Sequence, residues 1–577
     1  MRTTARCALV LDGHSRAAVE TLQALGRYGV EVDIAAERDC TAFHSRYVRQ
    51  RLTQPPTHFP HRVAEWIAEQ DALREYRLIV ASTEYSLQAF RMLSNDNPVR
   101  TKALLPGNES LNTALNKQKT CELASSLDIA VPRTTLIESG LKLPTVERYP
   151  VVLKPTKSIL VTSESVTTIA PEIVRNESER AAVLEKWLPY LPVQQQEYIA
   201  GRGLGIEFLF NQGQPVWHFA HERIHEYPLT GGASTYRRSV HADPTLLERA
   251  QRLLAALRWH GVAMVEFKVA PDGSFYLMEI NPRLWGSLAL SIDAGVNFPI
   301  GLWRIASNET LSPQPDYRVP YYTRDLINDL QWQAENLRAN HQDVLLLTRS
   351  RVRSFVEYLR PLLGKESWDH FDVRDLKVTF AILGTIGRRY FKAVQRKLRG
   401  RLTESKIVSM HRRAMRNLGH RTTPLRRLLF LCYGNICRSP VAEQLAKQVL
   451  TNLDVDSAGF HPQEGRRSPQ NIICAANRIG IDLVHSGSRC LTKQQIQRAD
   501  LICVMDGKNY GDLIGQYPEA ANRTLLLGLF LEQPAVNIPD PYRASDEKTR
   551  EVVSQISRAI NALARQLHKD LADESQA

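Results

Sequence analysis

Long hydrophobic runs are missing from this chain of 577 residues. No apolar stretch approaches the roughly 18 residues that a membrane-spanning helix needs. Residues 1–4 lead directly into a strand pattern, without the apolar core of a signal peptide. Cysteine is also scarce, at eight residues, which favours a reducing compartment over a disulfide framework. We therefore expect a soluble, cytoplasmic protein.

An excess of positive charge is missing from most of the chain, although the formal net charge is +13. Residues 388–427 contain 14 of the 74 Lys and Arg residues and one of the 61 acidic residues, Glu404. The remainder therefore has 74 minus 14, or 60, bases and 61 minus 1, or 60, acids. The whole net charge lies in this one segment, so it gives no support to nucleic-acid binding by the rest of the chain.

The basic segment has the pattern of a short amphipathic helix. Its apolar residues fall on one helical face, opposite the arginines and lysines: Tyr390, Phe391, Val394 and Leu398. Such a helix is compatible with three partners, which are solvent or the protein itself, an anionic membrane surface, and nucleic acid. We favour them in that order, because a run of charge is unspecific by itself.

A strand, a short loop and a helix follow one another at residues 428–443. The loop begins at Cys432 and ends at Arg438, six residues later. Backbone N–H groups in a loop at a helix N-terminus attract an oxyanion, and a guanidinium adds a planar, two-pronged donor. The same field favours the thiolate, which is the nucleophilic form of cysteine. The pattern predicts a phosphate-binding loop with a nucleophilic sulfur.

A proton donor for the leaving oxygen is predicted in residues 537–542. There, Asp540 lies between two prolines, which restrict the backbone and hold the carboxyl on a stiff loop. An isolated Asp-Pro is more often a simple turn. Nucleophile, oxyanion donor and acid together are much more specific, because each fills a distinct chemical role.

Over about residues 426–570 the chain resembles the low-molecular-weight protein tyrosine phosphatase family. The matching segments, in order, are Cys432-x5-Arg438-Ser439-Pro440, Ser457-Ala458-Gly459, His485, Asp500, Met505-Asp506 and Asp540-Pro541-Tyr542. The resemblance implies a Rossmann-like, four-stranded parallel sheet with flanking helices. It also implies hydrolysis of a phosphotyrosine protein or a small phosphomonoester without a metal or other cofactor.

The resemblance implies a role for each residue of this site. Cys432 forms a phosphocysteine and Arg438 holds the equatorial oxygens. Ser439 stabilises the thiolate and Asn435 braces the loop. Asp540 is first the general acid and then the base that activates water.

Two points about this site stay open from the sequence. Cys437, in the same loop, either forms a reversible disulfide with Cys432 or packs as a small buried side chain. An arsenate-reductase-like activity is the nearest competing chemistry, and it requires a relay of further thiols. Candidate relay thiols are Cys474, Cys490 and Cys503.

Tyr433 and Tyr542 are expected to border the mouth of the pocket, where an aromatic ring can sandwich phosphotyrosine.

The front of the chain opens with a strand, helix and strand over residues 6–35, as in doubly wound α/β folds. It lacks the GxGxxG of a dinucleotide site. Further on, Lys117 heads a helical stretch and Lys154 ends a β-branched strand, where it can meet a nucleotide phosphate. Glu266 and Glu279 each lie among apolar residues at strand spacing, and with a nearby amide such carboxylates suit magnesium bridged by triphosphate.

These segments resemble the ATP-grasp superfamily over about residues 1–310, most specifically in residues 278–283. The resemblance implies ATP and Mg²⁺ as cofactors, with a carboxylate that is phosphorylated and an amine that displaces the phosphate. The residues that it assigns are Glu266, Glu279 and Asn281 to magnesium, Lys117 and Lys154 to the α/β-phosphates, Glu197 and the Ile199 backbone to adenine, and Arg283 to the acyl phosphate.

The chain departs from this pattern in one loop. Residues 156–159, after Lys154-Pro155, contain no glycine, although such loops usually carry glycines that close over the phosphates. One hypothesis is a bifunctional enzyme that combines an ATP-dependent ligase with a tyrosine phosphatase. The alternative is a phosphatase regulated by an ATP-binding module without turnover. The predicted α/β domains are 1–115 before the ATP-grasp domain, 116–310 for ATP-grasp, 311–425 for a helical extension and basic bridge, and 426–577 for the phosphatase.

Overall fold

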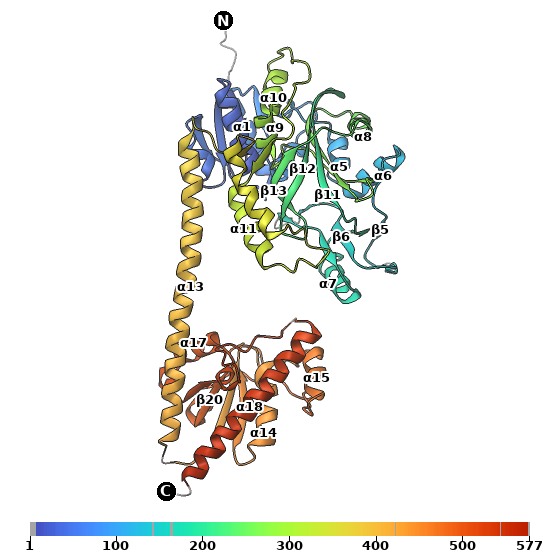
Figure 1. Ribbon diagram of the computed structural model, residues 1–577. Helices are drawn as coiled ribbons and strands as arrows, with labels where there is room; N and C mark the ends of the chain where they lie inside the picture. Colours follow the sequence, from blue (N-terminus) through green and yellow to red (C-terminus); the bar gives the residue numbers. More distant parts are fainter. Residues whose placement is uncertain (1–6, 141–142, 162–165, 422, 543, 575–577) are drawn as a thin grey trace. The chain divides into compact units, whose positions relative to one another are not determined.

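The computed structural model contains two compact units, residues 1–387 and 388–577 (Figure 1). The structure describes residues 7–140, 143–161, 166–421, 423–542 and 544–574. Side chains are described for all of these except residues 160–161, 166–167, 386, 389–403 and 569–574. Within these ranges, no helix has both the length and the apolar character needed to pass through a membrane.

The first unit begins with a parallel sheet of strand order β3-β2-β1-β4, which confirms the Rossmann-like start. Strands β1 and β2 are almost wholly buried, because helices pack on both faces of such a sheet. The strands are β1 (Cys7–Val10), β2 (Glu31–Ala36), β3 (Val48–Thr53) and β4 (Leu78–Val80). The helices are α1 (Arg16–Arg27), η1 (Thr41–His44), α2 (Pro60–Arg74), α3 (Glu84–Arg91), α4 (Pro98–Thr101) and α5 (Asn108–Ala114).

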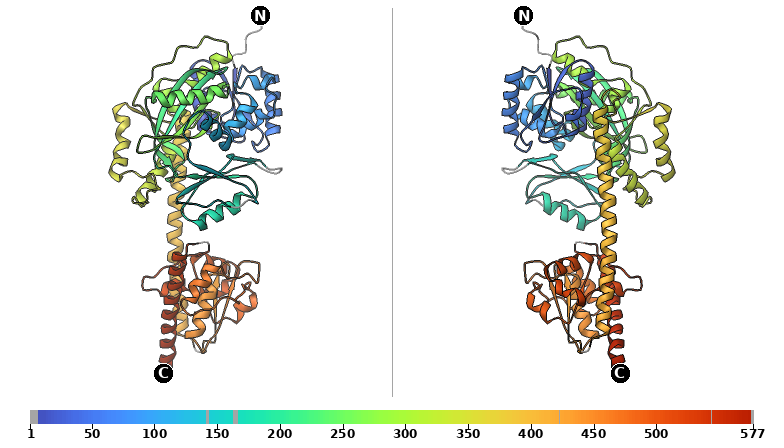
Figure 2. Two further views of the ribbon diagram at one scale, coloured as in Figure 1. Left: turned by 90° about the vertical axis from the view of Figure 1, so that its right-hand side faces the viewer. Right: turned by 90° about the vertical axis from the view of Figure 1, so that its left-hand side faces the viewer.

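A second, antiparallel sheet follows, with strand order β5-β10-β6-β9. Helix α7 covers one face of this sheet (Figure 2), and Trp187 from α7 packs against Leu153 and Val193. The elements are α6 (Lys117–Ser126), β5 (Thr134–Ile137), β6 (Val151–Pro155), the hairpin strands β7 (Ile159–Val161) and β8 (Val166–Thr168), β9 (Glu172–Val174), α7 (Glu177–Trp187) and β10 (Val193–Glu197).

The largest sheet of the first unit has seven strands, in the order β15-β14-β11-β12-β13-β16-β17. Its strands are β11 (Arg202–Asn211), β12 (Gln214–Tyr227), β13 (Ala233–Ser239), β14 (Gly261–Val269), β15 (Phe275–Asn281), β16 (Tyr322–Arg324) and β17 (Glu366–Trp368). The helices in this region are α8 (Pro244–Ala256), α9 (Leu288–Ala294), α10 (Phe298–Ala306), α11 (Leu326–Arg338), α12 (Arg351–Val356) and η2 (Glu357–Leu363).

Residues 311–375 differ from the predicted helical extension, because they also contribute two strands to this sheet. β16 pairs antiparallel with β13, and β17 pairs parallel with β16. Arg324 of β16 is fully buried and pairs with Glu366 at 2.8 Å and with Asp329. A strand of three residues is too short to show the period of two that identifies a strand. The sequence pattern therefore predicted only the neighbouring helices.

Helix α13 (Leu376–Gly419) contains most of the basic segment. Its first turn belongs to the core of the first unit through Val378, and its last turns belong to the core of the second unit through Ile407 and Ala414. The predicted apolar face lies among the residues whose side chains are outside the described set, so its partner stays a prediction. Those residues are Tyr390, Phe391, Val394 and Leu398.

The second unit is a four-stranded parallel sheet of order β19-β18-β20-β21, as predicted for the phosphatase resemblance. Its strands are β18 (Arg427–Cys432), β19 (Asp454–Gly459), β20 (Leu501–Val504) and β21 (Thr524–Leu526). Its helices are α14 (Arg438–Val449), α15 (Gln470–Asn477), α16 (Lys493–Arg498), α17 (Gly507–Gln516), η3 (Pro518–Arg523), η4 (Leu527–Phe530) and α18 (Asp546–Glu574).

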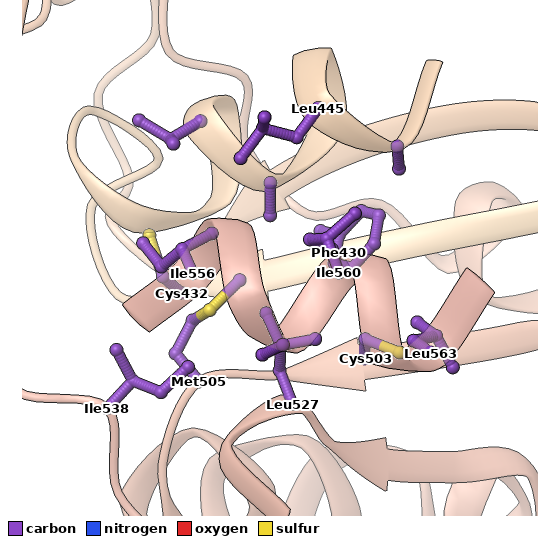
Figure 3. Packing of buried hydrophobic residues seen from close by; sticks show 14 of the residues in the cluster. Phe430, Cys432, Leu445, Cys503, Met505, Leu527, Ile538, Ile556, Ile560 and Leu563 are labelled. Carbon is purple, nitrogen blue, oxygen red and sulfur yellow. The ribbon is translucent and has the colours of Figure 1, made fainter. Parts of the chain in front are cut away.

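The core of this unit lies between β18 and the C-terminal helix α18 (Figure 3). Ile556, Ile560 and Leu563 repeat at helical spacing on one face of α18 and pack with Phe430. Cys432, at the end of β18, belongs to the same buried cluster. The end of the strand, and therefore the start of the loop after it, is fixed by close packing.

Candidate active sites

The loop of the second unit encloses the Cys432 sulfur. Cys432 ends β18 and is only 2% exposed, while Arg438 begins α14. The Asn435 backbone N–H donates to Cys432 Sγ at 3.2 Å, and the Ser439 hydroxyl lies 3.0 Å from the same sulfur. A buried sulfur with these neighbours can be stabilised as an anion.

Asn435 ties the loop to the strand beside it. Its Nδ2 donates to Ser439 Oγ at 2.9 Å and to Ser457 Oγ at 2.8 Å, and its Oδ1 accepts from the Arg489 backbone N–H at 2.7 Å. Its φ of +51° lies in the left-handed region, which asparagine tolerates better than most residues. A Cβ at Gly459 would lie 2.9 Å from Asn435 N, so only glycine fits there.

Arg438 is buried below the loop and is held by two carboxylates. Its Nη1 donates to Asp506 at 2.6 Å and to the Ile538 carbonyl at 2.9 Å, and its Nη2 donates to Asp540 at 2.9 Å. Within the described part of the chain, its buried Nε has no hydrogen-bond partner. An arginine held in this way keeps a donor available for an oxyanion.

Asp540 and Arg438 are therefore brought together although 102 residues separate them. The side chain of Asp540 is about half exposed, so its carboxyl can reach both solvent and the loop. Asp506 caps α17 and binds Arg438. It lies in a segment that matches the phosphatase family, but the sequence did not predict a role for it. Its position at the end of β20 was the available signal, because parallel strands end at the same edge as the phosphate loop.

Cys437 is a free thiol that packs in the core, as one of the two sequence alternatives expected. Burial raises the pKa of Cys437 to about 12, with a further contribution from the nearby Asp540. The other candidate relay thiols lie on separate elements. Cys474 is exposed on α15, Cys503 is buried in β20, and Cys490 donates to the His461 carbonyl at 3.2 Å. The arsenate-reductase alternative gains no support from this arrangement.

Two aromatic side chains near the catalytic loop are accessible. Tyr433 directly follows Cys432 and is 46% exposed, and Tyr542 directly follows Asp540-Pro541 and is 52% exposed. The Lys508 ammonium lies 4.8 Å from the centre of the Tyr433 ring. An aromatic ring with a cation beside it is suited to contact an aryl phosphate.

In the first unit, two of the three predicted magnesium ligands lie directly opposite each other. Glu266 of β14 and Glu279 of β15 are register partners. Asn281 Nδ2 donates to Glu266 at 2.9 Å and to Glu279 at 3.3 Å. The structure thus brings together two carboxylates and an amide, which is a set of oxygen donors of the kind that Mg²⁺ prefers.

The two predicted phosphate-binding lysines approach β15 from helix α6 and from strand β6 of the second sheet. Lys117, the first residue of α6, lies 3.7 Å from Glu279 and donates to Ser158 at 2.6 Å. Lys154 of β6 lies 3.8 Å from the Met278 sulfur, and burial lowers its pKa below the usual value. Burial alone would raise the pKa of Glu279, but the two lysines outweigh it and hold that pKa below its usual value.

Two residues of this site were missed by the sequence. Arg223 of β12 lies 2.6 Å from Glu266, and the pKa of Glu266 is raised by burial despite this partner. Glu84, the first residue of α3, lies in the field of Arg283 and Lys117, and burial raises its pKa. Glu84 follows the carboxyl end of β4 in a parallel sheet, where ligands commonly bind, and this position was the available signal.

The remaining predicted residues of the first unit are Glu197, Ile199 and Arg283. Glu197 ends β10, and its carboxylate accepts from the Arg133 backbone N–H at 2.9 Å and from Arg133 Nε at 3.1 Å. Ile199 lies in the loop after β10. Arg283 donates to the Leu284 carbonyl at 3.0 Å. Their assignment to adenine and to the acyl phosphate stays a prediction.

Two family models match parts of this chain. Residues 427–573 match the family described as low molecular weight phosphotyrosine protein phosphatase, and residues 196–324 match the family described as ATP-grasp in the biosynthetic pathway with Ter operon. The second unit is 33% identical over 142 residues to the low molecular weight protein-tyrosine-phosphatase Etp of Escherichia coli K12. That alignment covers 25% of this chain and 95% of Etp.

Two solved structures are also similar to this chain. Wzb of Vibrio vulnificus in complex with benzylphosphonate is 32% identical, with a TM-score of 0.24 over 25% of this chain and 99% of that one. The L-amino acid ligase of Bacillus licheniformis is 15% identical, with a TM-score of 0.42 over 53% of this chain and 76% of that one. Through residues 427–573 the chain belongs to the low molecular weight protein tyrosine phosphatase family, and residues 196–324 of its first unit match an ATP-grasp family model.

Proposed function

We propose that the second unit hydrolyses phosphotyrosine through a phosphocysteine. The S–P bond to Cys432 forms as the P–O bond to the tyrosine oxygen breaks, and Asp540 gives its proton to that oxygen. Asp540, now a carboxylate, takes a proton from water as the water oxygen attacks phosphorus. Inorganic phosphate leaves and the Cys432 thiolate is regenerated, while Arg438 stabilises the equatorial oxygens in both steps.

The observation that carries this proposal is the hydrogen-bond arrangement around one buried sulfur. Asn435 N–H and the Ser439 hydroxyl contact Cys432 Sγ, while the buried Nε of Arg438 has no hydrogen-bond partner among the residues that the structure describes. The exposed rings of Tyr433 and Tyr542 favour an aromatic phosphate ester over a small aliphatic one. A phosphotyrosine protein is therefore the preferred substrate class, and a small phosphomonoester is the alternative.

Alkylation of the full chain tests this proposal. We expect iodoacetamide at neutral pH to label Cys432 rapidly, and vanadate or inorganic phosphate to block the labelling. Cys474 is the matched control, because it is exposed and lies on α15 away from the loop, so vanadate should not change its rate. Slow labelling of Cys432, with no protection by either anion, would remove the basis of the mechanism.

We also propose that the first unit activates a carboxylate with ATP for attack by an amine. The support is the convergence of Glu266, Glu279 and Asn281 from one sheet with Lys117 of helix α6 and Lys154 of strand β6. The Mg²⁺ of MgATP bound at this site would neutralise part of the negative charge of the phosphates. Glu266, Glu279 and Asn281 would hold the metal, and the two lysines would orient the phosphates.

The competing hypothesis is an ATP-binding module that only regulates the phosphatase. Full-length chain with Cys432→Ser, which cannot consume phosphorylated products, should be incubated with MgATP and a panel of amines and carboxylic acids. ADP release that depends on a carboxylate, and increases with an amine, supports ligation. ATP binding without acceptor-dependent ADP release from any pair would favour the regulatory module.

A further inference from the structure

The last four turns of α13 are an integral part of the phosphatase unit (Figure 1). Ile407 is 6% exposed and Ala414 is 1% exposed, and both lie in buried clusters with residues of the sheet and its loops. His411, between them, accepts a hydrogen bond at Nδ1 from the Leu526 backbone N–H at 3.1 Å. This part of the basic segment is therefore committed to intramolecular packing.

The contacts show that α13 runs antiparallel to the strands of this sheet. Near its end, Asn417 donates to the Asn522 carbonyl and Arg421 donates to Asp500, and both acceptors precede strands. Ile407, ten residues before Asn417 and so about 15 Å away along the helix, lies instead beside Gly507, which follows β20. Ile407 is therefore at the edge of the sheet where the phosphate loop lies.

At that edge, Ile407 packs against the segment that leads to the general acid. A Cβ at Gly507 would lie 3.3 Å from Ile407 Cδ1, 3.5 Å from Val536 Cγ1 and 3.6 Å from Asn537 Oδ1. Asn537 also accepts from the Gly507 N–H at 2.9 Å. Ile407 and Val536 belong to the same apolar cluster. Through Gly507 and this cluster, the helix thus packs together with the chain four residues before Asp540.

A second contact anchors the start of this segment. His411 lies edge-on to Phe530, with ring centres 5.5 Å apart, in addition to its bond with Leu526. Between these anchors and the acid, Ile538 N–H donates to the Met505 carbonyl at 2.9 Å and the Ile538 carbonyl accepts from Arg438. Residues 526–540, here called the acid segment, are therefore held on one side by α13 and on the other by the catalytic arginine.

We propose that Ile407 and His411 are positioning residues that hold the acid segment so that Asp540 can protonate the leaving oxygen. The inference rests on the proposed role of Asp540 as general acid. Loss of the α13 contact lets the segment shift, and a displacement of about 1 Å is enough to impair proton transfer strongly. The hydrogen bonds to the Cys432 sulfur come from Asn435 and Ser439, which lie outside the acid segment, so they stay in place.

The test is Ile407→Ala in the full chain, measured as kcat/KM, which reports the steps up to cysteine phosphorylation. We expect a loss of about tenfold with phenyl phosphate, whose leaving oxygen needs a proton, and less than about twofold with p-nitrophenyl phosphate. Rates are normalised to the number of vanadate-protected thiols, so that unfolded protein does not contribute. Leu418→Ala, on the same helix but at the far edge, is the matched control and should change neither rate.

A double variant separates positioning from general destabilisation. In the Asp540→Ala background, Ile407→Ala should cost less than about twofold with either substrate, because no acid remains to be misplaced. Ile407→Val should restore most of the rate with phenyl phosphate. Equal losses for both substrates, no loss at all, or an undiminished loss in the Asp540→Ala background would overturn the positioning role. If Asp540→Ala itself shows no preference between the substrates, the acid role fails, and the inference fails with it.

Discussion

The two units build their candidate sites in opposite ways. In the second unit, the proposed nucleophile and oxyanion-binding arginine lie on seven consecutive residues at the junction of β18 and α14, and Asp506 and Asp540 come from distant parts of the chain. In the first unit, the side chains come from several separate elements, including α3, α6, β6, β14 and β15. A contiguous loop can be preorganised by local hydrogen bonds, whereas a dispersed site depends on the packing of whole sheets.

The two sites also differ in how their charged side chains are paired. In the first unit the cations and carboxylates contact one another, as in Lys117 with Glu279 and Arg223 with Glu266. A nucleotide with its metal must rearrange these pairs when it binds. In the second unit Arg438 is paired with two carboxylates, and within the described ranges its Nε has no partner, so this donor is available for the anion that we propose.

The strongest test of this separation is Cys432→Ser. We expect phosphatase activity of the full chain to fall by at least about 10⁴-fold, because an alcohol at this position is a far weaker nucleophile than a thiolate. Binding of inorganic phosphate, measured by calorimetry, should persist, and acceptor-dependent ADP release should not change. A matching loss in ADP release would show that the sites are not independent.

Asp540→Ala should have the next largest effect, and one that depends on the substrate. We expect kcat/KM to fall about 100-fold for phenyl phosphate and less than about tenfold for p-nitrophenyl phosphate, because only the poorer leaving group needs the proton. Steady-state kinetics with both esters measures this difference. Equal losses would argue that Asp540 acts mainly through its bond to Arg438.

A single substitution in the candidate site of the first unit should have a smaller effect, here on MgATP binding. We expect Glu279→Gln to weaken MgATP binding about tenfold, because it removes one charged ligand and leaves Glu266 and Asn281 in place. Equilibrium dialysis of the full chain with and without Mg²⁺ measures the effect. Glu222→Gln, on the same sheet but bonded to Arg238, is the control and should bind MgATP normally. Unaltered binding in Glu279→Gln would remove Glu279 from the metal site.

The smallest predicted effect is a pH dependence in the second unit. Burial lowers the pKa of His411 to about 4, from about 6.5 in the unfolded chain. The unfolded state therefore takes up the proton first, and stability should fall by about 2 kcal/mol or less as the pH drops from about 6.5 to 4. His411→Asn keeps an acceptor for the Leu526 N–H without the titration. On acidification, the hydrogen-exchange protection of the Leu526 amide should decrease less in the variant than in the original chain. An identical decrease in both would exclude His411 as the source of the pH dependence.

Residues that act within one short segment were predictable from the sequence. Cys432, Asn435, Arg438 and Ser439 lie within eight positions, so their order and spacing carried the chemistry, and the structure places them in one hydrogen-bonded loop. In the same way, the strand and helix patterns of the first 35 residues predicted β1, α1 and β2 closely. Local patterns determine local structure when propensity, spacing and burial agree.

Residues that act across elements were only partly predictable. Arg223 carries no local signal, and the only signal of Glu84 and Asp506 is a position after the end of a parallel strand, because their neighbours in the site are far away in the chain. β16 and β17 were missed because three residues are too few to show periodicity, and their pairing partners come from other parts of the chain. The contact of Ile407 with the acid segment has the same origin, since about 130 residues separate the two.

The amino-acid order by itself determined the resemblance to two families and the parallel sheet of the second unit, and it indicated the nucleophile, oxyanion donor and acid that we propose. Only the tertiary structure decided which distant charges meet, that the basic helix ends inside the phosphatase core, and which thiols lie apart from the loop. The physical reason is the range of the interactions. Hydrogen bonds within a loop act between residues close in sequence, whereas burial and charge pairing act between any residues that the packed sheets bring into contact.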